Sequence, residues 1–185
     1  MTLLAAILFA HAGQNAADLP RREMAKLDFM IGYWEGTLTD FQTDPPTVAH
    51  GYENVRSAAG GTALFDNALY EIETSGVKKP VNSIAAMIWF DTARQAHTMR
   101  IQSESGWSDQ FDLHPTQNGM DWSVKFGETT VYYTLRISPE GEWVESAVTD
   151  RASRKKIFEI RLKRTGPPRQ ESRFLSAPSL APRHP

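Results

Sequence analysis

Residues 107–137 have the sequence WSDQFDLHPTQNGMDWSVKFGETTVYYTLRI, in which apolar and polar side chains alternate. A period of two is typical of a β-strand with one buried face. The alternation breaks at residues 117–119 and again at 126–128, and each break is short enough for a hairpin turn. Consecutive strands joined by hairpins form an antiparallel meander, so this stretch predicts at least three neighbouring strands.

The same period extends to both sides and predicts about ten strands in all. Their expected ranges are 34–41, 47–57, 62–74, 82–90, 96–104, 107–113, 120–126, 129–138, 142–149 and 156–164. No helical segment interrupts them, which excludes a parallel sheet built from strand-helix-strand units. Closure of such a long meander removes its open edges. We therefore predict an all-β fold, an antiparallel up-and-down meander β-barrel. A flattened sandwich with a filled core would show the same alternation.

The two ends of the chain differ from this body. Residues 18–31 predict a short N-terminal helix, because Met24, Leu27 and Ile31 recur at spacings of three and four. Residues 165–185 hold five of the eleven prolines, a composition typical of a disordered, flexible tail. The predicted barrel domain therefore spans residues 18–164.

Residues 1–12, MTLLAAILFAHA, combine an apolar run with a small-x-small motif. This pattern predicts a signal peptide cleaved before Gly13, and hence a periplasmic or secreted protein. The run is too short to span a bilayer, so no stable membrane insertion is expected. The alternative is a short apolar helix packed against the domain.

Composition narrows the classes of protein and partner. The 185 residues are 41% hydrophobic and 23% charged, as in one globular domain. The absence of Cys excludes thiol catalysis, iron-sulfur clusters and thiolate zinc sites. A formal net charge of -2 leaves no basic surplus for binding nucleic acid or anionic lipid.

The tripeptide Gly32-Tyr33-Trp34 follows the predicted helix and opens the first predicted strand. A G-x-W element in this position resembles the lipocalins and related calycin barrels. Together with the string LDFMIGYWEG at residues 27–36, the meander and the Gly60-Gly61 turn, it resembles small, mostly uncharacterised bacterial lipocalin-like domains over residues 24–164. The outline is also similar to that of nitrobindin.

The resemblance implies that Trp34 lies at the closed end of the barrel, covered by a basic side chain of the last strand. In a ten-stranded meander the last strand ends beside the start of the first. Arg164 is therefore the candidate to stack on Trp34, with Arg161 as the candidate if the register differs by one.

Several large rings and a few polar groups fall on the predicted inward faces, which is the usual lining of a small-molecule pocket. The candidate ligand-binding residues are Asp66, Tyr70, His97, Trp107, Asp109, Trp122 and Tyr133. The same rings would also fill an ordinary core. An inward carboxyl group has a raised pKa unless a donor meets it, which is one route to acid-base chemistry.

Known catalytic and cofactor motifs are missing from the sequence. It contains no H-E-x-x-H, no G-x-S-x-G and no glycine-rich phosphate loop, so we assign no catalytic residue and no metal site. The resemblance to nitrobindin would imply a ferric heme held by a histidine of the late strands. Residues 115–164 contain no histidine, so no heme or other cofactor is expected.

Four functions remain open. The favoured hypothesis is an exported barrel that binds a small hydrophobic or amphipathic molecule inside it. The second is an enzyme on the same scaffold that uses an inward carboxylate or His97 as acid or base. The others are a filled barrel that binds a protein partner, and a heme-binding protein.

Overall fold

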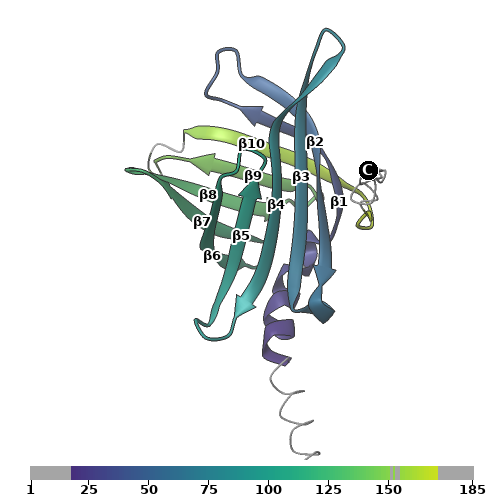
Figure 1. Cartoon of the computed structure of the whole chain (residues 1–185), viewed down its shortest axis with the longest axis vertical. Helices are drawn as coiled ribbons and strands as arrows, with labels where there is room; N and C mark the ends of the chain where they lie inside the picture. The colour runs from purple at the N-terminus through teal and green to yellow at the C-terminus, as the bar shows by residue number, and fades with distance from the viewer. Residues whose placement is uncertain (1–17, 151, 153–154, 171–185) are drawn as a thin grey trace, which may run out of the picture.

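The chain folds into a closed barrel of ten antiparallel strands (Figure 1). The structure is a computed structural model that describes residues 18–150, 152 and 155–170. Neighbouring strands in the sequence are neighbours in the sheet, and the last strand closes the barrel against the first. The predicted all-β meander barrel is thus confirmed. The predicted signal peptide, residues 1–12, lies outside the described residues.

The strand bounds agree closely with the alternation. The strands are β1 (Gly32–Asp40), β2 (Thr47–Ala58), β3 (Ala63–Thr74), β4 (Val77–Asp91), β5 (Ala96–Ser103), β6 (Ser108–Thr116), β7 (Gly119–Phe126), β8 (Thr129–Ile137), β9 (Trp143–Val148) and β10 (Lys156–Gly166). The largest difference is at β4, which begins at Val77 rather than at residue 82. A tight turn at Ser75 and Gly76, both with positive φ, lets the β3–β4 hairpin extend beyond the barrel.

The N-terminal helix closes one end of the barrel (Figure 1). Residues 18–24 are α-helical and continue into a 3-10 helix, η1 (Ala25–Met30). In a 3-10 helix the side chains at i and i+3 lie above one another. Met24, Leu27 and Met30 therefore share the buried face, whereas Ile31, predicted to complete that face, is the extended residue after the helix.

Trp34 lies at this closed end, as the resemblance implied. Its indole Nε1 donates a hydrogen bond of 2.7 Å to the carbonyl oxygen of Met30. The Arg164 guanidinium lies 4.5 Å from the centre of the Trp34 ring and donates to the carbonyl oxygen of Phe29 at 2.6 Å. Arg161, the alternative candidate, bonds to Glu159 instead. These contacts fasten the helix to the first and last strands.

The predicted tail is in part fixed to the barrel. β10 continues to Gly166, and the Arg169 guanidinium lies 3.5 Å from the centre of the Tyr33 ring. The backbone N–H of Arg169 donates to Asn54 Oδ1, and the Asn54 side chain donates back to the Arg169 carbonyl oxygen, both at 2.9 Å. The flexible tail predicted from residue 165 is therefore wrong for residues 165–170. Residues 171–185 lie outside the described part.

The barrel wall is incomplete between β6 and β7. Only residues 114–116 of β6 pair with β7, although all of β7 pairs with β8. Beyond this short ladder the rings of Trp107 and Phe126 lie 5.5 Å apart, centre to centre. The two strands are therefore unpaired near Trp107 and Phe126, and the contact between these two rings lies where the backbone hydrogen bonds are missing.

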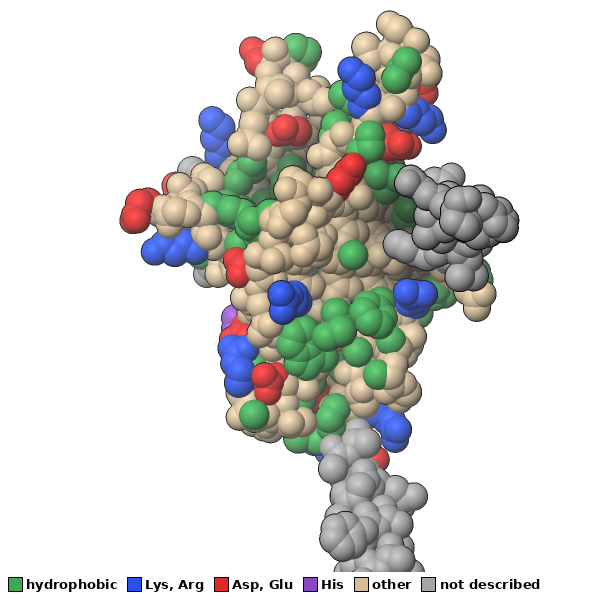
Figure 2. Space-filling model, in the orientation of Figure 1, with side chains coloured by type: hydrophobic (Ala, Val, Ile, Leu, Met, Phe, Trp, Pro, Cys, Tyr) green, Lys and Arg blue, Asp and Glu red, His purple; other side chains and the backbone are tan. Residues whose placement is uncertain are grey.

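The outer surface carries some exposed hydrophobic side chains. Figure 2 shows them gathered on one area of the wall. Phe65 of β3 and Met87 of β4 are directly paired on adjacent strands, and both are exposed. Among the described residues, no helix combines the length and the apolar character needed to cross a membrane.

Candidate functional site

The inside of the barrel contains a cavity of about 430 Å³. Met30 of η1 contributes to it from the closed end. Asp40, Trp107 and Phe126, which lie at strand ends or in the adjoining loop, contribute from the other end. The size falls in the usual range for small-molecule sites. The barrel is therefore hollow, which disfavours a filled core.

Aromatic side chains form one wall of the cavity. Trp122 and Tyr133 are directly paired across β7 and β8, and their rings stack at 5.1 Å with an interplanar angle of 7°. Phe158 of β10 extends this wall, with its ring 5.9 Å from that of Tyr133. Such rings offer a ligand a large apolar surface at fixed positions.

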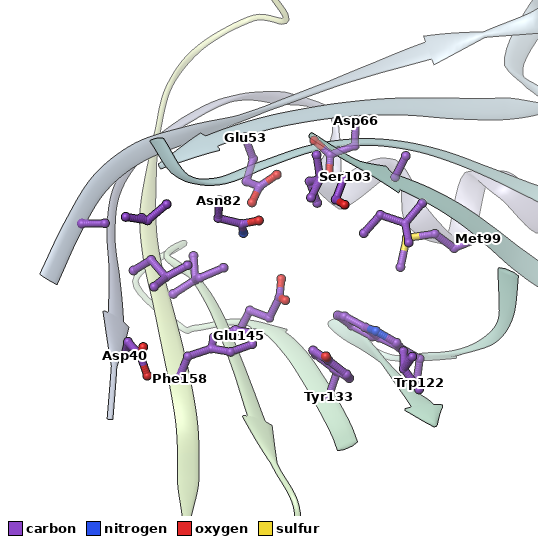
Figure 3. A pocket seen from close by; sticks show the side chains of 18 of the residues that line it. Asp40, Glu53, Asp66, Asn82, Met99, Ser103, Trp122, Tyr133, Glu145 and Phe158 are labelled. Carbon is purple, nitrogen blue, oxygen red and sulfur yellow. The ribbon is translucent and has the colours of Figure 1, made fainter. Parts of the chain in front are cut away.

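Besides Asp40 at the end of β1, three carboxyl groups line the same cavity. Glu53 of β2 and Asp66 of β3 come from neighbouring strands, and Glu145 of β9 comes from the wall opposite them. Figure 3 shows Glu145 pointing across the cavity toward Glu53, on the side that Trp122 and Tyr133 share. We call Glu53, Asp66 and Glu145 the carboxyl cluster.

The carboxyl cluster has few hydrogen-bond donors. Tyr70 donates its hydroxyl to Glu53 Oε1 at 2.8 Å, and the Trp143 indole lies 3.4 Å from Glu145 Oε2. Glu53 Oε2 and Asp66 Oδ1 are buried and find no partner among the described residues. The contact between the Glu53 and Asp66 carboxyl groups becomes a hydrogen bond only when one of them carries a proton.

Burial shifts the protonation of the whole cluster. Desolvation in the apolar barrel raises the pKa of Asp66 to about 6 and that of Glu145 to about 8. Desolvation, reinforced by the charges of Asp66 and Glu145, raises the pKa of Glu53 well above its usual range. Burial also raises the pKa of Tyr133 to about 12. These shifts favour the protonated forms of the cluster at pH values where exposed carboxyl groups are ionised.

Most of the predicted ligand-binding residues meet at this cavity. Asp66, Trp107, Trp122 and Tyr133 line it. Tyr70 is fully buried and is not part of the lining, but its hydroxyl orients Glu53. The structure thus assigns Tyr70 a supporting position behind the cavity wall.

His97 and Asp109, the other two predicted ligand-binding residues, do not line the cavity. His97 pairs with Phe90 and Leu113 near the closed end, where its Nε2 lies 3.0 Å from the Glu23 carbonyl oxygen. Asp109 pairs with Ile101 on the inward face, yet it is exposed and does not line the cavity. Both residues alternate in step with the inward-facing side chains of their strands. His97, however, lies too near the closed end, and Asp109 lies where β6 no longer pairs with β7.

Glu53 was missed in the sequence, and Glu145 was not distinguished from the other carboxylates. The inner face of β2 consists of Ala49, Gly51, Glu53 and Val55. These residues are too weakly apolar for the sequence to show which face of the strand is buried. Glu145 could have been found, since it alternates with Trp143 and Ala147, two buried apolar residues of β9.

Neither a group of side chains that could hold a metal ion nor a histidine lining the cavity is present among the described residues. They contain no group of three or more His, Cys, Asp or Glu side chains that could hold a metal ion. No histidine within residues 18–150, 152 and 155–170 lines the cavity, so a heme placed there would lack a histidine ligand from this part of the chain.

Comparison with known proteins adds no assignment. No model of a known protein family matches the chain, and no curated protein sequence matches it significantly. Its function must therefore be inferred from the barrel and the cavity.

Proposed function

We propose that this chain is a lipocalin-like, calycin-type barrel that binds a small hydrophobic or amphipathic molecule in its cavity, and that it is exported to the periplasm or the medium. The cavity of about 430 Å³ is the observation that carries the proposal. Its aromatic wall supplies apolar area, and a few inward polar groups supply orientation, which is the usual division of labour in such sites.

The closed end supports the calycin assignment. A short helix covers it, and the first-strand Trp34 is sandwiched between that helix and Arg164 of the last strand. This is the arrangement that the resemblance of the G-x-W element implies. Export rests on the sequence of residues 1–12 alone.

Filling the cavity tests the binding function. Ala86 of β4 lines the cavity and is the cross-strand partner of Asp66 on β3. The next residue in the chain, Ala85, is exposed on the outer face. We expect the neutral fluorescent probe N-phenyl-1-naphthylamine to bind the wild type with increased emission. Ala86→Phe should weaken binding at least tenfold, because the added ring occupies the site, and Ala85→Phe should not change it.

Circular dichroism and thermal unfolding establish that both alanine variants are folded before titration. A wild type that leaves probe emission unchanged would contradict the proposal. Equal losses of affinity in Ala86→Phe and Ala85→Phe would also contradict it, since they would place the probe outside the cavity.

Acid-base catalysis on the same scaffold is a second candidate. It is favoured by the pKa values of Asp66, about 6, and Glu145, about 8, because groups that titrate near neutral pH can both accept and release protons. Mass spectrometry of a metabolite extract incubated with the protein tests it. A compound consumed by the wild type but not by Asp66→Asn would support catalysis, whereas an unchanged extract would oppose it.

A further inference from the structure

We propose that the molecule bound in the barrel is an organic cation, a protonated amine on an apolar body, with its ammonium group held among Glu53, Asp66 and Glu145. This inference rests on the proposed function, because it specifies the chemical class of the ligand for the same cavity.

The charge of the lining is one-sided. Four carboxyl side chains line the cavity, three from the carboxyl cluster and Asp40 from β1. No Lys, Arg or His of the described residues lines it. A buried carboxylate without a counterion is costly, and the missing positive charge is what a cationic ligand would supply. A ligand carboxylate would instead meet like charge.

Two buried carboxyl oxygens of the cluster receive no hydrogen bond from outside the cluster among the described residues. Glu53 and Asp66 are 3% and 7% exposed, and Glu53 Oε2 and Asp66 Oδ1 have no donor among the described residues other than a proton shared between the two carboxyl groups. A primary ammonium group has three N–H donors and no acceptor. One such group can therefore serve both oxygens together with a carboxylate oxygen of Glu145, which points toward them (Figure 3). A ligand hydroxyl offers only one donor.

The aromatic wall suits the same ligand class. Trp122 and Tyr133 line the cavity on the side from which Glu145 projects (Figure 3). Indole and phenol faces attract cations, and the attraction grows when the cation is desolvated. The same rings also receive the apolar body, so head group and body are both accommodated within one cavity.

Binding of an ammonium group should release protons. A cation beside Glu53 and Glu145 favours their charged forms and so opposes the burial that raises their pKa values. The other titratable groups around the cluster are Tyr70 and Tyr133, whose pKa values burial raises, and Asp40 of the lining. The tyrosines stay neutral, so the released protons come from the cluster.

Three ligands with one alkyl chain and different head groups test the inference. We would titrate the protein with decylamine, 1-decanol and decanoate near pH 8 by isothermal titration calorimetry, since an alkylammonium is still charged there. We expect decylamine to bind at least tenfold more tightly than 1-decanol, and decanoate to bind more weakly than either. Repeating the decylamine titration near pH 7 in buffers of different ionisation enthalpy should reveal proton release, which 1-decanol should not cause.

The double variant Asp66→Asn with Glu145→Gln removes two of the three carboxyl groups of the cluster while conserving shape. It should reduce the advantage of decylamine over 1-decanol to less than threefold and leave 1-decanol affinity within threefold of the wild type. Asp109→Asn, which alters an exposed carboxyl group outside the lining, is the matched control and should keep the full advantage.

The outcomes separate this inference from the proposed function. If 1-decanol and decylamine bind the wild type equally and without proton release, the cationic ligand is wrong while the binding barrel stands. If none of the three compounds binds, the cationic ligand is wrong, and if N-phenyl-1-naphthylamine does not bind either, the binding barrel fails with it. Should the double variant not fold, the head-group series and proton release in the wild type still decide the question.

Discussion

The buried carboxyl groups of Asp66 and Glu145 make the stability of the folded protein depend on pH. In an unfolded chain carboxyl groups titrate near pH 4. In the folded barrel burial raises the pKa of Asp66 to about 6 and that of Glu145 to about 8. Between about pH 4 and pH 8 the folded state therefore holds more protons than the unfolded state. The free energy of unfolding decreases as the pH rises through this range.

We predict that the ligand-free protein loses thermal stability between pH 5 and pH 8. The Tm should fall by roughly 3 °C or more, because each kcal/mol shifts Tm by about 2–4 °C in a chain of this size. Glu145→Gln cannot ionise, so it should be more stable than the wild type at pH 8 and show a smaller fall. Thermal unfolding followed by circular dichroism measures both.

The exposed Glu104 provides the control for this prediction. Glu104→Gln should keep the pH dependence of the wild type, because its side chain lies in solvent. A wild-type Tm that rises from pH 5 to pH 8 would show that the carboxyl cluster is not desolvated in the folded state.

Strand parity identifies the face of a residue but not its height along the barrel. Asp66, Trp122 and Tyr133 were predicted correctly to face inward, and they lie at the level of the cavity. His97 and Asp109 have the same parity but lie at the helix-covered end and beyond the β6–β7 ladder. Height depends on where the helix ends and where neighbouring strands part, and neither is encoded in local alternation.

Strand β2 shows how an inner face can be built from small residues. A Cβ added at Gly51 would lie 2.1 Å from the Leu69 carbonyl oxygen and 2.5 Å from the Tyr70 ring. Gly51 therefore lets the Tyr70 ring pack over β2, from where its hydroxyl reaches Glu53. The space taken by one large ring on β3 explains why β2 shows no apolar face in the sequence.

Gly51→Ala should consequently destabilise the protein by about 2 kcal/mol or more, since the backbone must shift to admit the methyl group. It should also disturb the hydrogen bond from Tyr70 to Glu53. Chemical denaturation measures the loss. Gly166→Ala on β10 is the matched control, because a Cβ there meets nothing within 4 Å and its stability should be unchanged. Equal stabilities for the two variants would contradict the packing described for β2.

The ten strands were largely predictable from the sequence. The errors lie where the alternation of apolar and polar side chains is absent or is interrupted by prolines. The ten alternating runs correspond to ten strands, because one face of each is buried and the other is not. The start of β4, VKKPV at residues 77–81, was missed because it lies in a hairpin that extends past the core, so neither face is selected for burial. The proline content predicts a tail from residue 165 because it hides the contacts that Arg169 makes with Asn54 and Tyr33.

The barrel as a whole is closed at one end and hollow toward the other. The helix covers the closed end (Figure 1). Trp34 and Arg164 lie there too, and the cavity extends from Met30 to the strand ends opposite. Parity could not distinguish this hollow barrel from a filled sandwich, because both alternate. The distinction depends on closure of β10 on β1, a long-range pairing that follows from all ten strands together.

A crystal structure of the protein grown with decylamine is the most direct test that this barrel holds its ligand inside. We predict electron density for the alkyl chain along Trp122 and Tyr133, with the nitrogen about 3 Å from carboxyl oxygens of the cluster. An interior closed by packed side chains, with decylamine absent or bound only to the outer surface, would contradict it.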